Sequence, residues 1–193
     1  MGGHGICVLT MKKWHYHKRI QELSCECIHN IVFNYKDKRI DVIEALAVTG
    51  ALECIIKVMD RHADSLGIQR FGLAALGNLL YGKGEVLQVR GRRCVEDLDA
   101  ITTVVSATRR FPQNVMVQGC GCIVLTGLFK LGGDEYKMRM TEAGALMDIA
   151  SAVTNHPSNA LIEKEASTFM KLFFGWTTSG AQGDKSTKKI LRL

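Results

Sequence analysis

Proline is scarce in this sequence, and long apolar runs are missing. Only two of the 193 residues are proline while 47% are apolar, which excludes a disordered or collagen-like chain. No apolar run reaches the roughly 20 residues that a helix needs to cross a bilayer. The segment 1–10 has neither a basic stretch nor a cleavage site, so no secretory signal is predicted. We therefore expect a globular protein of the cytoplasm or nucleus, not secreted and with no membrane partner.

Cysteine spacings typical of zinc fingers are also missing. The seven cysteines are an odd number, which free thiols in a reducing compartment explain most simply. Cys25 and Cys27, like Cys120 and Cys122, are two residues apart. On a helix such side chains point about 200° apart and cannot hold one metal ion. We predict that these cysteines pack in the core, and we expect no metal and no cofactor.

Motifs of catalysis are absent as well. The sequence has no H-E-x-x-H motif, no nucleophile elbow and no recurrent pair of carboxylates. Gly119-Cys120-Gly121 lies within a helical pattern, and Gly82-Lys83-Gly84 lacks the spacing of a phosphate-binding loop. We therefore predict that the protein has no catalytic residues and is not an enzyme.

An internal repeat is the main feature that the sequence does have. Gly50-Ala51-Leu52 recurs 94 residues later as Gly144-Ala145-Leu146. Further copies lie at offsets of 48 and 49 residues, which align Gln21, Gln69 and Gln118. Repeats of this length are typical of helical arrays, in which each unit buries its apolar face only against its neighbours.

Each copy of the repeat has the pattern of three helices. From Leu52, apolar residues at positions i, i+3, i+4 and i+7 predict one helix, and a more apolar helix follows from Ile68. A shorter helix, which includes Ile40 in one copy, precedes the Gly-Ala corner. Pro112 and Pro157 fall at the same place in their copies, in the turn between two helices, where proline is tolerated.

These units resemble the armadillo repeat. The resemblance rests on the Gly-Ala corner and on the ending Ala75-Leu76-Gly77-Asn78-Leu79, and it covers about residues 2–174. It implies an all-α fold, a right-handed α-α superhelix of about four armadillo-like repeats. The expected solenoid spans 1–176, with units at about 2–35 (lacking its first helix), 36–83, 84–132 and 133–176, and a flexible basic tail follows at 177–193.

The resemblance also implies a function. Armadillo solenoids bind proteins or peptides along a concave groove formed by the third helices, where the asparagine of the ending faces the ligand. The equivalent positions here hold Asn30, Asn78, Gly127 and Leu172. The tryptophan that nuclear-import adaptors carry four residues earlier is absent from every copy. Asn30 and Asn78 could alternatively cap helices or join neighbouring repeats.

We therefore expect a protein-protein interaction scaffold whose partner, a peptide or a protein, contacts an exposed stripe of successive third helices. The residues predicted for this stripe are Glu26, Asn30, Phe33, Arg70, Ala74, Asn78, Tyr81, Ile123 and Lys130. The alternative is RNA binding, since the net charge is +6 and basic residues cluster at repeat edges, as at Arg109-Arg110. Helical repeats that read RNA use recurring polar side chains, which these helices lack.

Both ends of the expected array carry apolar residues. The first helix keeps Val8, Leu9 and Met11 in apolar register, and Phe173 and Trp176 lie at the other end. Because natural ends of helical arrays are polar, we expect neighbouring repeats in a longer parent chain or end-to-end self-association. The alternative is that the tail folds back over the last helix.

Overall fold

The computed structural model describes residues 3–34, 39–81 and 85–175. Every regular element in these ranges is helical, which confirms the all-α prediction. The tail expected at 177–193 lies outside the described residues. The helices are α1 (Gly3–Lys13), α2 (Lys18–Asn34), α3 (Arg39–Val48), α4 (Ala51–Arg61), α5 (Leu66–Leu79), α6 (Glu85–Arg92) with a π-helical turn at Arg93–Asp97, α7 (Ala100–Arg110), α8 (Val115–Gly132), α9 (Asp134–Ala143), α10 (Ala145–Asn155) and α11 (Ala160–Phe174).

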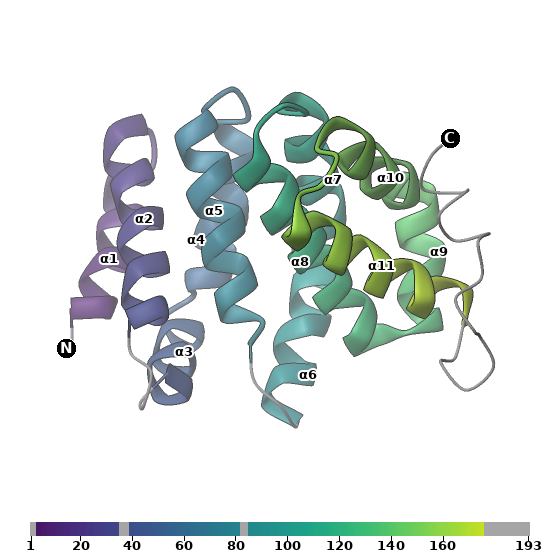
Figure 1. The fold of residues 1–193 in the computed structure, drawn as a ribbon. Coiled ribbons are helices and arrows are strands. Elements are labelled where there is room, and N and C mark those ends of the chain that lie inside the picture. Colours follow the sequence, from purple (N-terminus) through teal and green to yellow (C-terminus); the bar gives the residue numbers. More distant parts are fainter. Residues whose placement is uncertain (1–2, 35–38, 82–84, 176–193) are drawn as a thin grey trace.

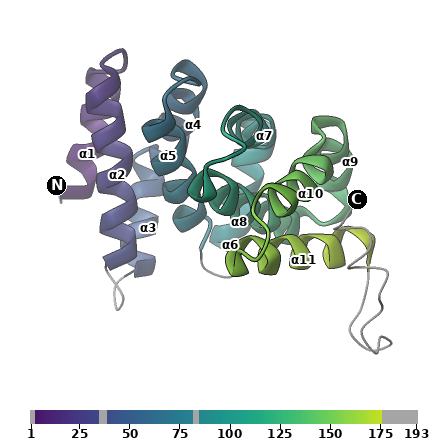
Figure 2. The ribbon, with the colours of Figure 1, turned by 45° about the horizontal axis from the view of Figure 1, so that its top comes forward.

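The longer helices form two layers. In one layer α2, α5, α8 and α11 follow one another, each in contact with the next (Figure 1). In the other layer α1, α4, α7 and α10 each pack on the helix of the first layer that follows them in the chain (Figure 2). The shorter α3 and α9 fill spaces beside these pairs, where α3 contacts α1, α2, α4 and α5. We refer to α2, α5, α8 and α11 as the third-helix layer.

The pairing of α4 with α5 shows how one unit is held together. Ile55, Ile56 and Met59 form the buried stripe of α4, as the apolar spacing predicts. Gly72 of α5 lies directly opposite Met59: a Cβ atom at Gly72 would come within 2.7 Å of the Met59 side chain. Glycine at this position therefore allows the two helices to pack closely. Gly121 of α8 lies against Thr108 of α7 in the same way.

A buried glutamine fixes the turn between the two helices of each of the first three pairs. The side-chain amide of Gln69 donates to the backbone carbonyl oxygens of Met59, at 2.7 Å, and His62, at 3.1 Å. Gln21 and Gln118 each donate to the carbonyls 10 and 7 residues before them. The carbonyl 10 residues back lies at the end of the preceding helix, where the glutamine supplies a donor, and the carbonyl 7 residues back also accepts the backbone N–H three residues after it, as His62 does from Ser65.

The corners before α4, α7 and α10 share one backbone conformation. Gly50 and Gly144 adopt left-handed φ angles of 85° and 79°, which glycine reaches without strain. Asp99, with φ of 50°, occupies the same place before α7. Aspartate tolerates this conformation better than most residues do, because its short side chain can hydrogen-bond locally. The turn therefore recurs where no glycine marks it.

The outer face of α1 and α2 carries exposed apolar side chains. Ile6 is 58% exposed, Leu9 50% and Leu23 42%. On the opposite end of the array Phe173 is buried, and Trp176 lies outside the described residues. Neighbouring repeats or self-association on these faces stay predictions.

Candidate functional site

The residues predicted to bind a partner lie on or at the ends of α2, α5 and α8, the first three members of the third-helix layer. Their exposure differs along the layer: Asn30, Phe33, Tyr81 and Lys130 are exposed, Glu26, Arg70, Asn78 and Ile123 are half-buried, and Ala74 is buried. The expectation of one continuous exposed stripe is wrong at Ala74, which is only 6% exposed. It is buried because α5 packs against α2 at this point.

Asn78 joins two neighbouring helices of the layer. Its Nδ2 atom lies 3.0 Å from Nδ1 of His29 and donates, at 3.4 Å, to the backbone carbonyl of the same residue. An amide nitrogen can only donate, so Nδ1 of His29 is the acceptor and the ring proton resides on Nε2. The ring also hydrogen-bonds the backbone of Ala74. The inter-repeat role left open for Asn78 is therefore present in the structure.

The environment of His29 favours a neutral ring. Burial lowers the pKa of His29 from its ordinary value of 6.5, whereas the Ala74 hydrogen bond and the nearby Glu26 carboxylate act in the opposite direction. A neutral imidazole agrees with the acceptor role of Nδ1. Protonation would place a second donor against the Asn78 amide.

Three aromatic rings and one guanidinium gather around this hydrogen bond. The rings of His29 and Phe33 are stacked with centroids 5.8 Å apart, and Phe71 of α5 lies 6.5 Å from His29. The Arg70 guanidinium sits 4.5 Å from the centroid of the Phe71 ring. We call His29, Phe33, Arg70, Phe71 and Asn78 the His29 cluster.

Two members of the cluster offer unused binding capacity. Phe33 is 61% exposed, so one large aromatic surface faces solvent. The Nε atom of Arg70 is buried and finds no acceptor in the described part of the chain. A buried donor without an acceptor is rare in proteins and costs free energy.

Sequence reasoning missed His29 and Phe71. His29 directly precedes Asn30, and Phe71 lies two helical turns before Asn78. The resemblance to armadillo repeats pointed to the position four residues before each asparagine, where the tryptophan of nuclear-import adaptors is absent from this chain. Searching every helical turn before the asparagines for aromatic side chains would have found Phe71.

Ile123 contacts Gly77 of α5, so α8 continues the layer beyond the cluster.

The thiols are free, and three of the seven are buried. All seven cysteines are unpaired in the structure. Burial raises the pKa of Cys25, Cys94 and Cys122 to about 12 and that of Cys120 to about 11, so these thiols are protonated at neutral pH. The core position predicted for Cys27 is wrong. This residue is exposed because it lies on α2, the first helix of the layer.

No metal site is formed by the described residues, since no three His, Cys, Asp or Glu side chains converge there. One described helix, α8, is long and apolar enough to cross a membrane by length and composition. Within the fold, 56% of that helix is buried against its neighbours, as in the core helix of a globular protein. Its composition therefore reflects its central place in the third-helix layer.

Comparisons with family models, with curated proteins and with solved structures found no match to the chain.

Proposed function

We propose that this protein is a scaffold of the armadillo type that binds an extended segment of a partner protein on the third-helix layer. The observation that carries the proposal is the His29 cluster, in which a solvent-facing Phe33 ring and the Arg70 guanidinium lie within one patch of α2 and α5. Aromatic and arginine side chains contribute most of the binding energy at protein interfaces.

The cluster suits a peptide better than a small molecule. Phe33 and, further along α5, the 52% exposed Tyr81 provide flat apolar surfaces for side chains of the partner. The guanidinium of the half-buried Arg70 suits a backbone carbonyl or a carboxylate of the same segment. Three pockets of the described structure, beside α3 and α6, between α7 and α10 and between α1 and α4, are lined by none of the cluster residues, so we expect the partner to lie across the surface.

The armadillo architecture is supported by the order and packing of the helices. Sets of a short helix and two longer ones recur, with left-handed corners at Gly50, Asp99 and Gly144. Neighbouring helices of the third-helix layer pack against each other more closely than α1, α4, α7 and α10 do. In a curved stack the closer-packed side lies inside the curve, which favours the third-helix layer as the concave binding side.

The basic clusters support RNA binding less well than the His29 cluster supports peptide binding, because several of their arginines form contacts within the fold. Arg90 is buried and donates to the carbonyl of Leu79 at 3.0 Å. Arg93 pairs with Glu53. Arg109 pairs with Asp148 at 3.0 Å, which leaves little of this charge for phosphates.

The proposal can be tested with peptides selected from a random library displayed on phage. The full chain is the bait, and synthetic labelled copies of the selected peptides are measured by fluorescence anisotropy. Phe33→Ala and Arg70→Ala should each weaken binding by about tenfold or more, as expected for interface hot spots. Neither substitution removes a side chain from the apolar core of α2 and α5.

The matched control is Val48→Ala. Val48 is 89% exposed and lies on α3, outside the third-helix layer, so its loss should leave the affinity unchanged. Failure to select any peptide, or affinities that depend on Val48 and not on Phe33 and Arg70, would refute the proposed surface.

A further inference from the structure

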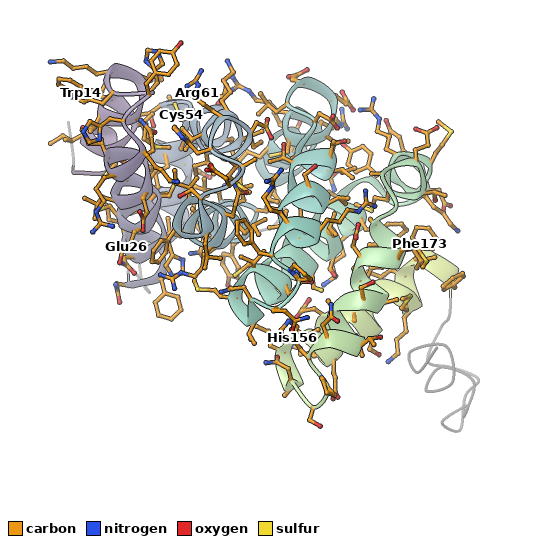
Figure 3. The ribbon with its side chains drawn as sticks, turned by 90° about the horizontal axis from the view of Figure 1, so that it is seen from above. Trp14, Glu26, Cys54, Arg61, His156 and Phe173 are labelled. Atoms are coloured by element: carbon orange, nitrogen blue, oxygen red, sulfur yellow. The ribbon has the colours of Figure 1, made fainter. Side chains whose placement is uncertain are left out.

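A small pocket lies between α1 and α4, in the layer opposite to the proposed peptide surface. Its volume is about 240 Å³, and Cys54 lies among its lining residues. Figure 3, which views the protein from above, labels Cys54 and Arg61 near one another on α4, with Trp14 at the end of α1. Three of the other side chains that line the pocket are cationic: Lys12, Lys57 and Arg61.

Two of these cations, Lys12 and Arg61, are held in place by neutral groups. Lys12 Nζ donates to the backbone carbonyl of Thr49 at 2.9 Å, and Arg61 Nη1 donates to that of His15 at 3.2 Å. The Arg61 guanidinium also lies 4.9 Å from the Tyr16 ring centroid. Within the described residues, no carboxylate comes within ion-pair distance of Lys12, Lys57 or Arg61.

One carboxylate does line the pocket, but it has a partner of its own. Glu53 forms an ion pair with Arg93, which lies outside this pocket. The other carboxylate oxygen of Glu53, Oε2, is buried and accepts no hydrogen bond, so the pocket lining still sets three cations, Lys12, Lys57 and Arg61, against this one carboxylate. Three like charges on one small pocket repel one another, and an anion between them would relieve this repulsion.

A second pocket at the same place in the repeat shows that the fold does not require this charge. It lies between α7 and α10, with a volume of about 220 Å³. Arg109 there is the counterpart of Lys12, and Asp148 is the counterpart of Cys54. Asp148 pairs with Arg109 at 3.0 Å, so this pocket neutralises its own cation. Lys57 and Arg61 correspond to Ser151 and Asn155, which are uncharged.

We propose that the pocket between α1 and α4 binds a phosphate group, either free or as a phosphate monoester on a partner. Lysine and arginine are the side chains best suited to a phosphate dianion, and Lys12 and Arg61 keep further N–H donors after their backbone hydrogen bonds. Cys54, an uncharged thiol, stands where the second pocket has Asp148, the carboxylate that pairs with Arg109. The phosphate would thus supply the negative charge that Asp148 supplies between α7 and α10.

The test uses the full chain with inorganic phosphate and with a phosphoserine peptide, followed by phosphorus NMR and calorimetry, with chloride as the background anion. Cys54→Asp copies the second pocket and should weaken binding about tenfold, because a fixed carboxylate would compete for the same cations. Cys54→Ser, which adds no charge, should leave the affinity unchanged.

A second comparison keeps the test decisive if Cys54→Asp does not fold. Lys57→Gln removes one exposed cation of the pocket and should weaken binding, whereas Lys171→Gln removes one exposed cation of α11 and should not. Tighter binding of the phosphopeptide than of inorganic phosphate would identify a partner's phosphate as the ligand, and equal affinity would identify the free anion. No binding of either, or equal losses in Lys57→Gln and Lys171→Gln, would overturn the proposal.

Discussion

The Asn78 amide lies 3.0 Å from the His29 ring and joins α5 to α2 inside the third-helix layer. The same asparagine was expected to face a ligand, as in armadillo proteins. In this structure its polar capacity is used, at least in part, between the repeats. Under the proposed function, recognition at this place would depend on the neighbours of Asn78, above all Phe33 and Arg70, while Asn78 joins their two helices.

Asn78→Ala should lower the free energy of unfolding by about 1–2 kcal/mol, because it leaves the half-buried His29 ring without its donor. Asn30→Ala is the matched control. Asn30 holds the equivalent position on α2 but is exposed, so its loss should change stability by less than about 0.5 kcal/mol. Urea denaturation followed by circular dichroism measures both, and equal losses would contradict the role assigned to Asn78.

Stability should fall as the pH drops below 6.5. The pKa of His29 is lowered by burial in the folded chain, so the unfolded chain binds the proton more tightly. The stabilising effect is complete above the unfolded pKa and is lost as the pH falls toward the folded pKa. His29→Gln, which keeps an acceptor for Asn78 but does not titrate, should show a smaller loss between pH 7.5 and 5.5. Identical pH profiles would show that His29 does not contribute.

Gln69→Leu should destabilise the protein by about 2–3 kcal/mol. The substitution keeps the volume of the side chain but leaves the buried carbonyl of Met59 without its donor, while the His62 carbonyl keeps the N–H of Ser65. Gln88→Leu on the exposed face of α6 should change the unfolding free energy by less than about 0.5 kcal/mol. If both variants unfold at the same denaturant concentration, the glutamine does not fix the turn.

Two glycine substitutions should act in opposite directions. Gly50→Ala should cost about 1 kcal/mol, because alanine is strained at φ of 85°. Gly127→Ala should stabilise by up to about 1 kcal/mol, since Gly127 lies inside α8 and a Cβ atom there would meet no atom within 4 Å. Thermal unfolding of the two variants against the wild type measures both signs, and a stabilised Gly50→Ala would rule out the corner geometry.

The sequence was most informative where the spacing of apolar residues and a turn-forming glycine mark the same helix. The apolar spacing from Leu52 and the corner glycine Gly50 agree with α4, which begins at Ala51. The corner before α7 could not be recognised in the same way. Asp99 adopts the left-handed conformation without the glycine that signals it elsewhere.

Contacts between side chains of neighbouring repeats could not be predicted from the sequence. The partner of Asn78 is His29, 49 residues earlier, and no local pattern connects them. The burial of Ala74 and the exposure of Cys27 have the same origin, because both depend on whether a neighbouring helix covers that face. Residues at equivalent positions of successive repeats therefore lie on equivalent helices but can differ in burial and in their contacts.

Hydrogen exchange with and without a peptide selected against the full chain tests the central claim most directly. The proposed surface predicts slower amide exchange in α2 and α5, around Phe33 and Arg70, with the difference absent in Arg70→Ala at the same peptide concentration. Slower exchange confined to α4, α7 and α10, with α2 and α5 unchanged, would contradict the claim that the third-helix layer binds the partner.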